Sequence, residues 1–131
     1  MKIDRQKVND KLNGHCGYCG VIIHITEMQV DHIIPKVDFV SCVTNRFRVP
    51  YFLQHLTIAD LNHIDNLMPT CRVCNKWKTF HPLEIFRKEL NEQVKRLRDY
   101  SSNFRIAERY GLVEETGLSV KFYFEYKQLN K

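Results

Sequence analysis

Four cysteines in two closely spaced pairs have the clearest chemistry in this sequence. They are Cys16-x-x-Cys19 and Cys71-x-x-Cys74. Each Cys-x-x-Cys turn brings two sulfurs close enough to share one tetrahedral ion, and two such turns complete the four-thiolate shell of structural zinc. The alternative is that the four are reduced thiols in a core. Because the long spacer 20–70 exceeds that of a compact zinc ribbon, we expect the ion to clamp the ends of an inserted strand and loop.

A second set of polar side chains accompanies the cysteines. Asp31 and His32 are neighbours between the pairs, Asn66 precedes the second pair, and Asn75 follows it. A neutral histidine can take a proton from water near neutral pH, and carboxylate and amide oxygens are ligands that suit Mg²⁺ or Mn²⁺. Hydrolysis of a phosphodiester needs such a base and such a cation. Taken singly, each residue is more often structural, so the inference depends on their occurring together.

In this order the residues resemble the signature of the HNH nuclease family. The resemblance rests on Val30-Asp31-His32-Ile33-Ile34-Pro35 and on Asp65-Asn66-Leu67-Met68-Pro69-Thr70-Cys71-x-x-Cys74-Asn75-x-x-Lys78. The first cysteine pair matches the zinc-bearing members of that family, and the match spans about residues 15–79. The resemblance implies an α+β fold, in which a ββα-metal core is held by the four-cysteine zinc site.

The resemblance also implies a role for each residue. His32 would be the general base that activates water, and Asn66 would brace the loop between the strands and orient His32. Asp31 and Asn75 would bind the catalytic metal. Asn75 stands where the family has His or Asn, and Thr79 stands where a second His could follow, so Mg²⁺ or Mn²⁺ is favoured. The implied activity is metal-dependent endonucleolytic cleavage of DNA, leaving 5′-phosphate and 3′-hydroxyl ends.

The basic residues supply candidate contacts to a nucleic acid. The formal net charge is +5, which suits a polyanionic partner. The candidates nearest the proposed metal site are Lys78, which belongs to the family-like pattern, and Lys76, Arg72 and Lys36. Arg46 and Arg48 lie in a basic, aromatic segment that would either contact a groove or be an ordinary solvated insertion.

Local patterns predict the elements that position these residues. We expect a helix over 4–13 with Asp4 as N-cap and Gly14 as terminator, strands over 21–25 and 28–34, and an extended piece over 66–70. A helix over 72–79 should begin inside the second cysteine pair. Thr57 to Asp60 resembles the capping box of a short helix.

The remainder of the chain predicts two further helices and a strand. An apolar stripe of helical period predicts a helix over 82–98, followed by a helix over 104–110. Alternating apolar residues predict a half-buried strand over 119–126. Because no domain boundary is visible, we expect a single domain over 1–131, with its motif core at 15–79 and a helical and strand extension at 80–131.

Two other functions remain open from the sequence. One is a zinc-stapled nucleic-acid-binding module without cleavage, and the other is a nuclease subunit whose activity a partner protein gates in a defence or phage system. A homodimer is a further possibility, because cutting both strands with a one-metal site needs two copies or two sequential nicks. No apolar run reaches the roughly 20 residues of a membrane span, and the charged N-terminus lacks a signal-peptide pattern. We therefore expect no membrane partner and a cytoplasmic, intracellular location.

Overall fold

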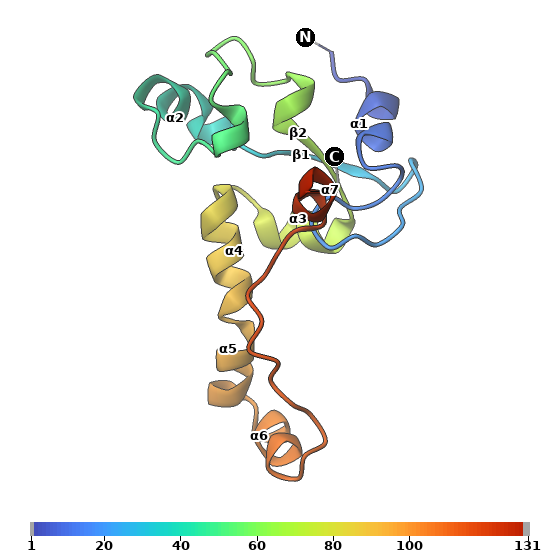
Figure 1. Ribbon diagram of the computed structural model, residues 1–131, viewed down its shortest axis with the longest axis vertical. Helices are drawn as coiled ribbons and strands as arrows, with labels where there is room; N and C mark the ends of the chain where they lie inside the picture. The colour runs from blue at the N-terminus through green and yellow to red at the C-terminus, as the bar shows by residue number, and fades with distance from the viewer. Residues whose placement is uncertain (1, 130–131) are drawn as a thin grey trace.

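The computed structural model describes residues 2–129, which form helices and one small two-stranded sheet (Figure 1). The α-helices are α1 (Arg5–Lys11), α2 (Phe39–Asn45), α3 (Arg72–Lys78), α4 (Leu83–Asn91), α5 (Gln93–Tyr100), α6 (Ser102–Arg109) and α7 (Tyr123–Leu129). The strands are β1 (Gln29–His32) and β2 (Leu67–Thr70), and the 3₁₀ turns are η1 (Lys36–Asp38), η2 (Tyr51–Leu53) and η3 (Ile64–Asn66). The α+β class predicted from the sequence is confirmed.

The two strands and the helix after them carry the residues of interest. β1 and β2 are antiparallel, and Asp31 pairs with Met68 and His32 with Leu67. The predicted extended piece before the second cysteine pair and the helix starting inside it are confirmed as β2 and α3. Pro69 is tolerated in β2 because a two-stranded sheet has only edge strands. Its carbonyl accepts a hydrogen bond from the Gly17 amide at 2.8 Å, which joins the first cysteine turn to the sheet.

The N-terminal helix also forms as predicted. The Asp4 carboxylate accepts hydrogen bonds from the amides of Gln6 and Lys7 and so caps α1. Gly14, with φ of +81°, lies just beyond the helix end in a conformation that favours glycine.

The predicted strand over 21–25 is wrong. Within this run, Ile22 makes only an isolated bridge to His15. The backbone instead folds back on the cysteine turn: the Cys16 amide donates to the Val21 carbonyl, and the Ile23 amide donates to the Gly14 carbonyl. The β-branched run therefore closes a tight loop around the first cysteine pair.

The predicted strand over 119–126 is also wrong, because its second half is helix α7. Glu125 reaches back to accept a hydrogen bond from the Phe122 amide at 2.8 Å, which is half of a capping box. The amides of Tyr123 and Phe124 donate to the Tyr18 and Gly17 carbonyls. The start of α7 is thus bonded to the first cysteine turn, and the alternation of Phe122 and Phe124 reflects burial at a helix start.

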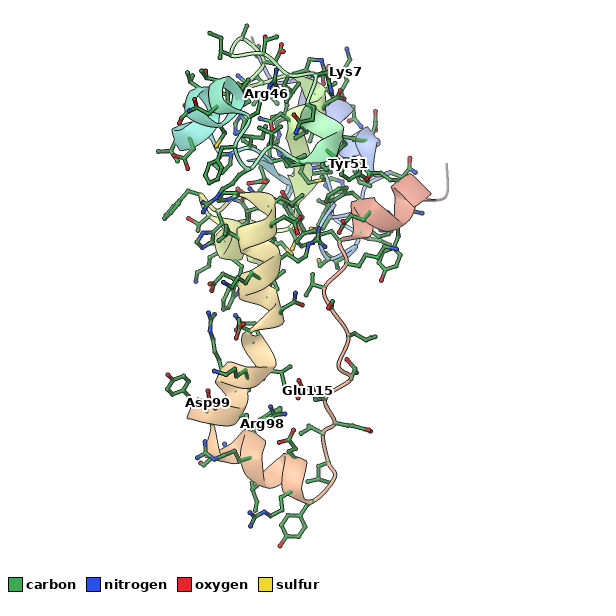
Figure 2. All side chains as sticks on the ribbon, turned by 60° about the vertical axis from the view of Figure 1, so that its left-hand side comes forward. Lys7, Arg46, Tyr51, Arg98, Asp99 and Glu115 are labelled. Carbon is green, nitrogen blue, oxygen red and sulfur yellow. The ribbon has the colours of Figure 1, made fainter. Side chains whose placement is uncertain are left out.

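Helices α4 to α6 form an arm that extends away from the rest of the protein (Figure 1). The helix predicted over 82–98 is divided at Glu92 into α4 and α5. The helix predicted over 104–110 is confirmed as α6. Near the tip, the Arg98 guanidinium donates to Glu108 at 2.8 Å and to Glu115 at 2.6 Å, and Figure 2 shows Arg98 and Glu115 facing one another. Ion pairs therefore connect the arm to the chain that returns beside it.

The segment 36–63 contains more structure than the sequence suggested. It includes η1, α2 and η2, none of which was predicted. Over 57–60 the predicted helix is replaced by a turn, although the Asp60 carboxylate does accept hydrogen bonds from the Thr57 amide and hydroxyl. In the described part of the chain, none of the helices has the length and apolar character needed to cross a bilayer.

Asn66 holds the long connection between β1 and β2. Its side chain is fully buried; Oδ1 accepts from the Ile34 amide at 2.8 Å, and Nδ2 donates to the carbonyls of Leu61 and Ile34 at 3.0 and 3.4 Å. Its own carbonyl accepts from the Ile33 amide at 2.8 Å. Through these hydrogen bonds Asn66 braces the loop after His32.

We predict that Asn66→Ala lowers the free energy of unfolding by about 2–4 kcal/mol, because it leaves buried backbone groups of Ile34 and Leu61 without partners. Urea denaturation would measure the change. Asn103→Ala, at an exposed position of α6, is the matched control and should cost less than about 0.5 kcal/mol. Equal effects of the two substitutions would contradict the bracing role.

Candidate metal centre and the polar residues around it

The four cysteines of the two pairs converge in the structure. All four sulfurs lie within 4.8 Å of one another, and the Sγ atoms of Cys19 and Cys71 are 3.8 Å apart. Cys71 also caps α3, because its sulfur accepts a hydrogen bond from the Cys74 amide. Cys42 is buried in the core and is outside the cluster, as predicted. Four cysteines this close can hold a structural metal ion such as zinc.

The clustered cysteines also change one another's pKa values. A hydrogen bond from the Cys74 thiol, helped by nearby backbone amides, lowers the pKa of Cys16 to about 4 although burial opposes this. The pKa of Cys74 is raised, first because its thiol donates to Cys16 and then because of burial. Cys16 is thus stabilised as a thiolate by the Cys74 proton, and binding of a divalent ion would release that proton because metal-binding cysteines are thiolates.

Asp31 is buried and bonded to two side chains that the sequence did not connect with it. The Tyr18 hydroxyl donates to Oδ2 at 2.5 Å, and the Lys78 ammonium lies 3.2 Å from Oδ1 and 3.0 Å from Oδ2. Lys78 is fully buried and also donates to the His32 carbonyl at 3.1 Å. We expected Lys78 at a DNA phosphate, whereas here it connects α3 to β1.

Burial dominates the electrostatics of this pair. It raises the pKa of Asp31, and the charge of Lys78 and the hydrogen bonds to the carboxylate oppose the rise. Burial likewise lowers the pKa of Lys78, against the attraction of Asp31. As placed, Asp31 does not fit a divalent ion, because an ammonium already lies against both carboxylate oxygens. The carboxylate and amide donors of Asp31 and Asn75 suit Mg²⁺ or Mn²⁺ chemically, but Lys78 would have to move first.

His32 is oriented by a residue that sequence reasoning missed. Its Nε2 lies 2.7 Å from Oδ1 of Asn62. Because an amide oxygen only accepts, the proton of the neutral ring belongs on Nε2, and Nδ1 keeps a lone pair. Asn62 stands four residues before Asn66, and that spacing by itself gives no sign of its role.

The other predicted site residues are distributed over three elements, α3, η1 and the end of α2. Asn75 is half-buried on α3, one turn before Lys78, and Arg72, Lys76 and Lys36 are exposed. Arg46 caps α2 in the left-handed conformation and donates to the carbonyls of Gln54 and Leu56.

Arg48 lies over the Phe47 ring at 4.8 Å. Arg46 and Arg48 are both exposed at the end of α2. The segment predicted as a groove-contacting loop therefore presents a guanidinium stacked on an aromatic ring, together with a second arginine that is tied to nearby backbone.

Comparisons with models of known protein families, with curated proteins and with solved structures gave no match. The function must therefore be argued from the residues and their geometry.

We predict that Cys19→Ser weakens or abolishes the four-sulfur metal site. In the cobalt-substituted protein, this would appear as loss of the thiolate-to-cobalt charge-transfer absorption. Cys42→Ala, which changes a buried cysteine outside the cluster, should keep that absorption even if stability falls. Loss of the absorption in Cys42→Ala and its retention in Cys19→Ser would refute the assignment.

We predict that Lys78→Met lowers the free energy of unfolding by about 3–5 kcal/mol near neutral pH, because it leaves Asp31 buried without its cation. The substitution raises the pKa of Asp31 further above the unfolded value, and such a carboxyl loses its contribution to stability as the pH rises through the folded pKa. The deficit should therefore be smaller at about pH 5 than at about pH 8.

Denaturation of the wild type and the variant at both pH values would measure this difference. The matched control is Lys76→Met, which removes an exposed lysine from the same helix and should change stability little at either pH. A deficit in Lys78→Met that does not depend on pH would contradict the buried pair.

Proposed function

We propose that this chain is a metal-dependent endonuclease that hydrolyses phosphodiester bonds of DNA, with His32 as the general base. The observation that carries the proposal is the hydrogen bond between His32 Nε2 and Oδ1 of Asn62. With the amide oxygen as the acceptor, the Nδ1 lone pair is left to accept a proton, on a histidine that ends β1 and directly follows Asp31. The resemblance of these residues to the HNH signature supplies the reaction class.

The arrangement of elements supports the proposal. β1 carries Asp31 and His32, β2 returns antiparallel to it, and α3 follows at once and packs on β1. This order is the one implied for a ββα-metal core. The cysteine cluster lies where β2 passes into α3, so an ion there would fix the angle between sheet and helix.

In the proposed mechanism His32 accepts the proton of the attacking water at Nδ1. Asn62 holds the ring by its Nε2–H and stabilises the imidazolium that forms. Asn66 fixes the backbone immediately after His32 through the amides of Ile33 and Ile34. The base is thus held from its side chain and from the backbone that follows it.

By the resemblance, Asp31 and Asn75 would hold Mg²⁺ or Mn²⁺, and such an ion would supply positive charge at the phosphate. Lys78 lies against both carboxylate oxygens of Asp31 and would have to move before an ion could bind there. Exposed Arg72, Lys76 and Lys36 would bind neighbouring phosphates.

One observation favours a second candidate function. The Asp31 carboxylate is already bonded to Lys78 and Tyr18. The same residues are therefore compatible with a zinc-stapled nucleic-acid-binding module that does not cleave DNA. A third possibility is a nuclease subunit whose activity a partner protein gates. These functions differ in whether the isolated protein cleaves DNA and whether His32 is needed.

We predict that His32→Ala lowers the rate of DNA cleavage by about 10²–10⁴-fold, because the general base is lost, while DNA binding is retained. The assay is nicking of supercoiled plasmid with Mg²⁺ or Mn²⁺, and with EDTA as the metal-free reference. His24→Ala, which removes an exposed histidine outside the proposed site, is the matched control and should cleave like the wild type.

Metal-dependent cleavage by the wild type that disappears in His32→Ala would establish both the activity and its base. DNA binding without cleavage under any metal condition would instead favour the binding module or the partner-gated nuclease. Cleavage of equal rate in wild type and His32→Ala would refute the role of His32.

A further inference from the structure

We infer a second metal site, formed by His55, His63 and Asp65, for Zn²⁺ or another divalent transition metal. One ring nitrogen of each histidine and a carboxylate oxygen of Asp65 lie within 4.8 Å of one another. These residues are outside the four-cysteine cluster and outside the proposed catalytic set. The spacing of positions 55, 63 and 65 along the sequence does not by itself indicate a metal site.

The ligand atoms converge on one carboxylate oxygen. Nε2 of His55 lies 2.8 Å from Oδ2 of Asp65, and Nδ1 of His63 lies 3.8 Å from the same atom. Bonds of about 2.0–2.2 Å at tetrahedral angles place ligand atoms about 3.3–3.6 Å apart. The two observed distances bracket that spacing, so small side-chain movements are enough to admit an ion.

Hydrogen bonds and ring contacts hold the two histidines near Asp65. Nδ1 of His63 accepts a hydrogen bond from the Asp65 amide at 3.0 Å, and this bond would have to break before Nδ1 could bind an ion. The two imidazole rings lie edge to face with centroids 5.9 Å apart.

The donor set decides which ion would bind. Two imidazole nitrogens and one carboxylate suit Zn²⁺ and related transition metals, whereas Mg²⁺ prefers oxygen ligands. All three side chains are partly exposed, so an ion can enter and water can complete its shell. The site therefore differs in donors and accessibility from the cysteine cluster, whose Cys16 is fully buried.

The position of the site gives it a structural consequence. His55 follows η2, which the buried Leu53 anchors, and His63 and Asp65 belong to the turn of η3. A metal bound across them would close the loop 55–65, which contains Asn62. Where the proposed nuclease function holds, this ion would steady the residue that orients His32.

The test is the zinc content of the protein after metal removal, reconstitution with Zn²⁺ in the presence of excess Mg²⁺, and gel filtration. Wild type should retain one more zinc per chain than either His55→Ala or Asp65→Asn. Two different variants are used so that a folding defect in one does not decide the result. His81→Ala is the matched control and should retain as much zinc as the wild type, because His81 lies outside the cluster.

Equal zinc content in the wild type and both site variants would overturn the inference, as would an equal loss in His81→Ala. In the cobalt-substituted protein, His55→Ala should keep the thiolate charge-transfer absorption of the cysteine cluster, which separates the two sites. None of these measurements uses DNA, so their outcome is independent of whether the chain is a nuclease.

Discussion

The turn Cys16–Cys19 is the point on which the rest of this structure depends. Its sulfurs lie with those of Cys71 and Cys74, so it is held to the junction of β2 and α3. Its backbone joins two further elements, because the Gly17 amide donates to β2 and the Gly17 and Tyr18 carbonyls accept from the start of α7. A side chain at 17 would displace Met68, since a Cβ there would lie 2.0 Å from the Met68 sulfur.

The same turn connects the metal centre to the candidate catalytic strand. Tyr18, which lies between the two cysteines, has its ring packed among Phe86, Phe122 and Phe124 and its hydroxyl on Asp31. Burial and the adjacent carboxylate raise the pKa of the Tyr18 hydroxyl, which therefore stays a hydrogen-bond donor to Asp31. Tyr18 therefore links the cysteine cluster to β1, as Lys78 of α3 also does.

The buried ion pair of Lys78 and Asp31 opposes metal binding at Asp31. A fully buried ammonium and a buried carboxylate stabilise one another only as a pair, and separating them is costly. Binding of a divalent ion by Asp31 would need to compensate for that separation. The exposed His55, His63 and Asp65 group carries no such cost, because water reaches it.

The sequence by itself determined the local features of this protein. The paired cysteine spacing predicted the cluster, and Asp4, Gly14 and the strand before Pro35 predicted elements that formed, because caps, turns and short-range periodicity act within a few residues. It mispredicted 119–126, where the alternation of Phe122, Phe124 and Tyr126 indicated a strand and the cap that Glu125 forms was recognised only in the structure. It also gave no sign of the α2 helix or of the division of the arm helix at Glu92.

Only the tertiary structure decided which polar groups meet. The partners of Asp31 are 13 and 47 residues away at Tyr18 and Lys78, and His32 finds Asn62 30 residues away. No periodicity encodes such distances, because these contacts exist only after the chain has buried its apolar side chains. Burial also gives them their strength, since a carboxylate and an ammonium interact far more strongly once water is excluded. The sequence therefore supplied the reactive residue types, and folding decided which of them are paired, oriented or open to solvent.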